Sequence, residues 1–175
     1  MIIFIPKSAY HIVPLKVYES IQRQNTPQLN LKVIEVIGDI KKPEKTPSQH
    51  TVSARNLYLR IASKMQDSYF MSMDSDKVIV KNGIIEEMLN KMESDNTIAA
   101  LSLSEKKVPS LSPGHIDLAC TLYRTSALDN IEFKCKLPCE CGYFTDDLKK
   151  SGYKHIYFSK EPLIETIDRE VYGTD

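Results

Sequence analysis

Short apolar runs alternate with stretches of helical periodicity along this chain. The run from Ile2 to Ile5 is continuous and stops at Pro6, which predicts a strand buried on both faces. A helix is expected over residues 14–24, where apolar side chains recur at helical spacing after a proline that suits a first helical turn. The same reasoning predicts further strands at 31–37, 69–73, 97–103, 116–123 and 154–158, and helices at 48–65, 84–92 and 143–151. This alternation indicates an α/β fold, a single compact Rossmann-like domain over residues 1–175 whose mostly parallel, mixed central sheet carries helices on both faces.

Composition restricts the partners of the protein. The chain has 175 residues, 42% of them hydrophobic, and its 23 Lys and Arg balance 23 Asp and Glu. This length suits one hydrophobic core, and this composition excludes a disordered or collagen-like chain. A chain with no net charge lacks the basic field that holds nucleic acids, so we expect a small-molecule partner and no nucleic acid.

The sequence carries no recognisable membrane or export signal. No stretch approaches the roughly 18 consecutive apolar residues of a membrane span, and the opening run is too short for the core of a signal peptide. We therefore expect a cytoplasmic protein without a transmembrane segment and with reduced cysteines. Cys135, Cys139 and Cys141 do not follow the paired spacing of structural zinc sites and are expected to be free thiols.

Three polar groups follow predicted strands, at the edge where α/β sheets bind ligands. They are Pro6-Lys7-Ser8 after the first strand, Gly38-Asp39 after the second and Asp74-Ser75-Asp76 after the third. The chain has only six glycines and no glycine-rich phosphate loop. A bound diphosphate would therefore need a metal ion and cationic side chains.

Asp74 and Asp76 are the best metal candidates. Two carboxylates two residues apart at the end of a buried strand suit a hard divalent cation that keeps several waters and takes further ligands from phosphates. The alternative is a polar turn, because Asp and Ser also favour turns for their own backbone hydrogen bonds. The position after a buried strand, and Ala54-Arg55-Asn56 about twenty residues upstream on the preceding predicted helix, favour the metal site.

The chain resembles a nucleotide-sugar glycosyltransferase of the GT-A fold, and within it the large family 2. The resemblance extends nearly from end to end of the sequence. Its motifs are Ile3-Phe4-Ile5-Pro6, Ser20-Ile21-Gln22-Arg23-Gln24, Ala54-Arg55-Asn56, Met73-Asp74-Ser75-Asp76, Leu122-Tyr123-Arg124, Ile131-Glu132-Phe133, Glu140 and Gly152-Tyr153-Lys154.

This resemblance implies a donor site for a UDP- or GDP-type sugar nucleotide. Its nucleotide base is expected at Pro6, Lys7, Ser8 and Asp39, and its diphosphate at Arg55. Asp74 would face the ribose or the metal, Asp76 would bind the metal, and Ser75 between them belongs to the same donor site. The implied cofactor is Mn²⁺ or Mg²⁺, which stabilises the leaving nucleoside diphosphate. The acceptor, a glycan, lipid or protein, is not identified.

The sequence departs from the family at the general base. The family carries a Glu-Asp pair whose Asp deprotonates the acceptor in inverting members, whereas this chain has Glu140-Cys141. A thiol with an ordinary pKa of about 8.5 is a poor base at neutral pH, so Glu140 is the candidate catalytic residue. Asp146 and Asp147 are alternatives, but beside Lys149 and Lys150 they are expected to form solvated ion pairs. Inversion is the expected stereochemistry, and a retaining reaction would need no such base.

Several other polar residues are candidates for smaller roles. His115 and Asp117 lie at the start of a predicted strand in the expected acceptor region, where they would either bind acceptor hydroxyls or face water. Glu165 lies where many relatives place a late metal-binding His, which makes it a possible third ligand. His155 is expected to be structural.

Two other functions remain open from the sequence. A catalytically idle sugar-nucleotide or glycan-binding module is suggested by Cys141 and by the short segment after Phe158, about 17 residues. A sugar-phosphate nucleotidyltransferase is less favoured, because the loop after the first strand holds no glycine. Since the chain is short for a glycosyltransferase, a homo-oligomer in which a second subunit completes the acceptor cleft is a further hypothesis.

Overall fold

The computed structural model describes residues 1–7, 11–38, 47–105, 116–134, 140–168 and 170–171. The predicted site residues Ser8, Asp39 and His115 therefore lie outside the described residues, as do Cys135 and Cys139. The elements in chain order are β1 (Ile2–Lys7), β2 (His11–Ile12), α1 (Leu15–Gln22), β3 (Lys32–Ile37), α2 (Pro47–Ala62), β4 (Tyr69–Met73), β5 (Lys77–Ile79), α3 (Ile84–Ser94), β6 (Ile98–Glu105), β7 (Cys120–Arg124), a 3-10 turn (Thr125–Ala127), α4 (Glu140–Lys150), β8 (Lys154–Thr166) and β9 (Glu170–Val171).

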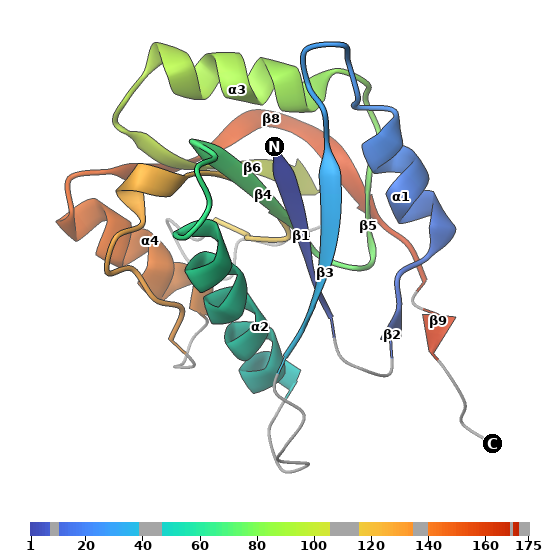
Figure 1. Ribbon diagram of the computed structural model, residues 1–175, viewed down its shortest axis with the longest axis horizontal. Coiled ribbons are helices and arrows are strands. Elements are labelled where there is room, and N and C mark those ends of the chain that lie inside the picture. The colour runs from blue at the N-terminus through green and yellow to red at the C-terminus, as the bar shows by residue number, and fades with distance from the viewer. Residues whose placement is uncertain (8–10, 39–46, 106–115, 135–139, 169, 172–175) are drawn as a thin grey trace.

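Seven strands form one mixed sheet in the order β3-β1-β4-β7-β6-β8-β5 (Figure 1). β1 pairs in parallel with β3 and β4, and β6 pairs in parallel with β8. β7 lies antiparallel between β4 and β6, and β5 pairs antiparallel with β8. The carboxyl ends of β1, β3, β4, β6 and β8 therefore meet at one edge, together with the start of β7. This arrangement confirms the predicted α/β class and the mostly parallel sheet.

Helices cover both faces of the sheet, as predicted. Buried side chains of α1 and α3 form one core, which includes Met71, Met73, Met88 and Met92. Side chains of α2 and α4 form the second core on the opposite face. Six aromatic rings stack through this second core: Phe4, Tyr58, Phe70, Tyr123, Phe133 and Phe144. The two cores fix the sheet edge as a rigid floor, on which loop residues can be held.

β1 does not stop at Pro6 but continues to Lys7. Pro6 pairs with Val36 of β3, whereas the pairing of β1 with β4 covers only Ile2 to Phe4. Because β1 does not pair with β4 beyond Phe4, the missing backbone N–H of Pro6 removes no hydrogen bond to β4. Lys7 therefore ends a strand rather than lying in a loop.

Three further differences concern the second half of the chain. α4 begins at Glu140 rather than at residue 143, and β6 extends to Glu105 rather than ending at residue 103. β8 continues to Thr166, well beyond the predicted residue 158, because its far half pairs with β5. β5 has only three residues, too few to give a periodic signal. These pairings place Lys77, Glu105 and Thr166 beside the aspartates that follow β4.

In the described part of the chain, no helix is long and apolar enough to cross a membrane. The two described cysteines, Cys120 and Cys141, are both buried.

Candidate functional site

Three backbone hydrogen bonds hold the turn that follows β4 at the carboxyl edge of the sheet. The Asp74 N–H donates to the carbonyl of Ala119 at 2.7 Å, and the Lys77 N–H donates back to the carbonyl of Asp74 at 3.1 Å. The Ile167 N–H donates to the carbonyl of Asp76 at 2.9 Å. Backbone bonds to two other segments therefore fix the direction of the two aspartates before any ligand is considered.

Arg55 joins this turn to the first turn of α4. Its guanidinium is almost fully buried, and it donates to Asp74 Oδ1 at 3.2 Å and to Glu140 Oε1 at 3.0 Å. The same group lies 5.7 Å from the centre of the Phe133 ring. One buried cation thus binds two carboxylates from elements about 65 residues apart, counted from Asp74 to Glu140. The sequence placed Arg55 at the diphosphate, and in this structure its ion pairs are made with protein carboxylates.

The carboxylate of Asp74 lies in an environment that favours a cation. Burial is the main cause that raises its pKa, and the nearby charges of Asp117 and Asp76 raise it further, although Arg55 acts in the opposite direction. A divalent cation would relieve this repulsion, so the donor set fits a hard metal ion. Within the described residues there is no group of three or more His, Cys, Asp or Glu arranged to hold a metal. Such an ion would therefore complete its coordination with water and phosphate oxygens.

The predicted third ligand, Glu165, does not join this group. It lies in β8 opposite Val78 of β5, and its side chain is exposed. Ser75 is buried within the turn beside Asp76. The structure therefore brings together Asp74, Asp76, Arg55 and Glu140 at the site but leaves Glu165 outside it.

Lys7 is not a free cation at the end of β1. Its Nζ forms an ion pair with Glu35 of β3, and the Tyr18 hydroxyl donates to the same carboxylate. Although burial acts to raise the pKa of Glu35, the hydrogen bonds from Lys7 and Tyr18 lower it below its usual value. Glu35 was missed from the sequence. The available signal was that Glu35 is a polar position in the alternating pattern of a predicted strand. That signal could be used only once the pairing of Ile5 in β1 with Glu35 in β3 was known.

A second missed group lies beside Asp76. The buried Lys77 Nζ donates to Glu105 Oε2 at 2.8 Å and to Thr166 Oγ1 at 2.6 Å. These bonds tie β5 to the ends of β6 and β8. They hold the strand that follows Asp76, and hence the second aspartate of the turn.

Asp147 and His155, two polar residues considered from the sequence, make their contacts within the protein. Asp147 pairs with Lys134 and Lys150, so it belongs to surface ion pairs as expected. His155 is buried, with Nε2 2.8 Å from Ser102 Oγ and Nδ1 2.8 Å from Thr145 Oγ1. Both ring nitrogens are thereby occupied within the protein.

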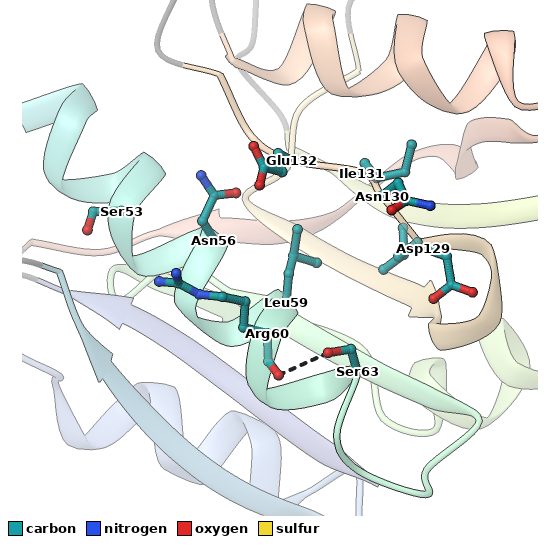
Figure 2. A pocket seen from close by; sticks show the side chains of 10 residues that line it. Ser53, Asn56, Leu59, Arg60, Ser63, Asp129, Asn130, Ile131 and Glu132 are labelled. Atoms are coloured by element: carbon teal, nitrogen blue, oxygen red, sulfur yellow. Dashed lines mark hydrogen bonds between the residues drawn. The ribbon is translucent and has the colours of Figure 1, made fainter.

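Asn56, next to Arg55, holds the segment that contains Phe133. Its Nδ2 donates to the Phe133 carbonyl at 2.9 Å, and its Oδ1 accepts the Phe133 N–H at 2.8 Å. Asn56 also lines a groove of about 600 Å³ between α2 and residues 128–132 (Figure 2). This groove contains none of the predicted site residues.

Replacing Asn56 by Ala should lower the free energy of unfolding by about 1–3 kcal/mol, because a backbone N–H and C=O are left without their partners. Urea denaturation measures this change. Ser63→Ala, directly after the same helix and in the same groove, is the matched control and should change stability by less than about 0.5 kcal/mol. Equal effects of the two substitutions would mean that Asn56 does not hold the Phe133 segment.

The fold is that of GT-A type nucleotide-sugar glycosyltransferases. No protein-family model matches the chain, and no curated protein matches its sequence. Among solved structures, residues covering 97% of this chain superpose on 58% of Staphylococcus aureus TarS 1–349 in complex with UDP-GlcNAc, with 16% identity and a TM-score of 0.64. The mannosyltransferase PcManGT from Pyrobaculum calidifontis, in complex with GDP-Man and Mn²⁺, gives 12% identity and a TM-score of 0.62 over 92% of this chain and 54% of its own.

A third similar structure is a glycosyltransferase involved in glycosylation of the major capsid of PBCV-1. It shares 15% identity and a TM-score of 0.59, over 93% of this chain and 90% of its own. By contrast, the chain spans only 36% and 59% of the first two TarS structures that it matches. At these identities the likeness establishes the fold, and membership of family 2 stays a prediction.

Proposed function

We propose that this protein is a metal-dependent glycosyltransferase that transfers a sugar from a UDP- or GDP-type donor to an acceptor. The observation that carries the proposal is the turn of Asp74 and Asp76, fastened at the carboxyl edge of a GT-A sheet and linked by Arg55 to Glu140. Solved proteins of the same fold were captured with UDP-GlcNAc and with GDP-Man and Mn²⁺, which supports the donor class and the metal.

Asp74 and Asp76 would hold Mn²⁺ or Mg²⁺ in this proposal. When bound, such an ion neutralises charge that develops on the leaving diphosphate. The turn contributes by holding both carboxylates in place, so little conformational freedom is lost on binding. Lys7, beside Glu35 at the end of β1, and the adjacent Pro6 would line the base of the nucleotide.

Arg55 takes a different role from the one that the resemblance implied. Because its guanidinium is buried and paired with Asp74 and Glu140, we assign it the task of orienting Asp74 rather than of contacting the diphosphate directly. A buried cation between two carboxylates also lowers the repulsion that Asp74 meets before the metal arrives.

The alternative function is a module that binds sugar nucleotides without turnover. The observation that favours it is Cys141, a buried thiol at the position where the resemblance expects the general base. Binding alone is common to both functions, and release of the nucleotide separates them.

Calorimetric titration with UDP-, GDP-, CMP- and dTDP-sugars, with and without Mn²⁺, tests the proposal. We expect a UDP- or GDP-sugar to bind only when Mn²⁺ is present, followed by slow release of the nucleoside diphosphate. Metal-dependent binding without any release would favour the idle module. If none of the sugar nucleotides binds, the proposed donor site is wrong.

A further inference from the structure

Cys141 and Glu140, which occupy the expected position of the general base, do not suit that role in this structure. Cys141 occupies the expected position with a thiol, and Glu140 Oε1 is bound by the buried Arg55 guanidinium at 3.0 Å. One of the two Glu140 oxygens is therefore engaged by the guanidinium rather than presented to an acceptor hydroxyl. Neither residue is therefore well suited to deprotonate an acceptor hydroxyl.

Asp117 brings another carboxylate to the same place from a different element. It lies three residues before β7, and its neighbour Ala119 accepts the Asp74 N–H at 2.7 Å. The charge of Asp117 is also one of the causes that raise the pKa of Asp74. Asp117 thus lies beside the proposed donor site although it is 43 residues away from Asp74 in the sequence.

Tyr157 of β8 holds Asp117 against the sheet. The Asp117 N–H donates to the Tyr157 hydroxyl at 2.9 Å. Burial is the main cause that raises the pKa of Tyr157, and the charges of Asp117 and Cys141 raise it further, while that hydrogen bond opposes it. The backbone of Asp117 is therefore fixed by a side chain of the strand that runs beside β6.

The side chain of Asp117 is held but not neutralised. Its Oδ1 accepts the Ala119 N–H at 3.1 Å, which orients the carboxylate within its own turn. Among the residues that the structure describes, no Lys, Arg or His forms an ion pair with it. The group is half-buried, so an oxygen remains available to an approaching hydroxyl. A carboxylate with a fixed position and, in the described part of the chain, no ion pair to a basic side chain suits the role of a general base.

We propose that Asp117 is the general base of an inverting transfer and replaces the missing aspartate at Cys141. Asp117 takes the proton of the acceptor hydroxyl as the acceptor oxygen forms its bond to the anomeric carbon. The bond between that carbon and the diphosphate oxygen breaks, and its electron pair leaves with the nucleoside diphosphate. Asp117 then releases the proton to solvent. This assignment rests on the proposed function, and it gives the role of base to a residue that the sequence had singled out only for binding acceptor hydroxyls.

Hydrolysis of the bound donor tests the assignment with water as the acceptor. Wild type and Asp117→Asn are compared with the UDP- or GDP-sugar that binds, in Mn²⁺, by nucleotide release and by calorimetric Kd. We expect Asp117→Asn to lower kcat by about 10²–10⁴-fold, the usual contribution of a general base. The donor Kd should change by less than about threefold, because the residue acts on the acceptor. Formate should partly restore turnover in Asp117→Ala, since a small carboxylate can enter the space left by the side chain.

Glu140→Gln is the matched control, and NMR of the released sugar reports its configuration. Glu140→Gln should retain more turnover than Asp117→Asn, and the product should be inverted. Turnover that survives in Asp117→Asn but is lost in Glu140→Gln, a retained configuration, or an equal loss of donor affinity would each overturn the assignment while leaving the proposed function in place. If wild type binds the donor but never hydrolyses it, the assignment of Asp117 as the general base is likewise overturned. Failure of wild type to bind any donor would instead overturn the proposed function, and the assignment with it.

Discussion

Asp76→Asn is expected to abolish metal-dependent donor binding while the fold stays intact. The substitution keeps the size of the side chain but removes one of the two carboxylates that would hold the cation. Loss of an outer-shell group already costs 10–100-fold in metal affinity, so loss of a ligand should weaken Mn²⁺ and donor binding by about 100-fold or more. Calorimetry with the UDP- or GDP-sugar and Mn²⁺ measures the effect.

Thermal unfolding gives an independent measure of the same site. Mn²⁺ at about 100 times its Kd should stabilise wild type by about 2.7 kcal/mol, which corresponds to a rise in Tm of roughly 5–10 °C for a chain of this size. Asp76→Asn should lose this rise. Asp67→Asn makes the same chemical change before β4, at the opposite end of that strand, and should keep it. Unchanged Mn²⁺ and donor affinity in Asp76→Asn would remove this residue from the site.

Arg55→Met should be the most destabilising single change at the site. It leaves the carboxylates of Asp74 and Glu140 without their shared buried cation. Removing one partner of a buried ion pair costs about 3–5 kcal/mol, so the Tm should fall by roughly 6–20 °C. The donor Kd should rise as well, because Asp74 loses the group that orients it. Differential scanning calorimetry and donor titration below the new Tm measure the two effects.

A double-mutant cycle identifies the cause of that loss. Glu140→Gln removes one of the two carboxylates that Arg55→Met leaves unpaired. It should therefore cost less stability in the Arg55→Met background than in wild type, by about 0.5–3 kcal/mol of coupling. Strict additivity of the two changes, or a normal Tm with a weakened donor Kd, would show that Arg55 contacts the donor instead of tethering the two segments.

Several parts of the site were accessible from the sequence because they depend on local pattern. The buried strand Tyr69–Met73 was predicted with its exact bounds, and the aspartates that follow it were thereby assigned to the edge of the sheet. The helix predicted from residue 84 does start at Ile84, and Gly83 before it adopts a φ of 75° that suits glycine. Arg55 was singled out by its motif, although not for the ion pairs that it makes.

Other parts depended on pairings that no local pattern carries. β5 is three residues long, and the far half of β8 is stabilised by pairing with it, so neither has a periodic signal of its own. The ion pairs of Lys7 with Glu35 and of Lys77 with Glu105 join residues 28 positions apart in each case. The first pair joins the neighbouring strands β1 and β3, and the second joins β5 to β6 on either side of β8, so both depend on the strand order of the folded sheet. Glu140, the first residue of α4, likewise bonds to Arg55, which lies 85 positions earlier in the chain.

The sequence by itself determined the α/β class, the mostly parallel sheet and the two aspartates at the end of β4. Each of these follows from short-range regularities: apolar runs, helical spacing and the residues that directly follow a buried strand. Only the tertiary structure decided that Arg55 joins Asp74 to Glu140, and that the Asp117 N–H donates to the Tyr157 hydroxyl. Strand order and register bring these groups together, and they are set by the packing of both cores against the whole sheet rather than by any single segment.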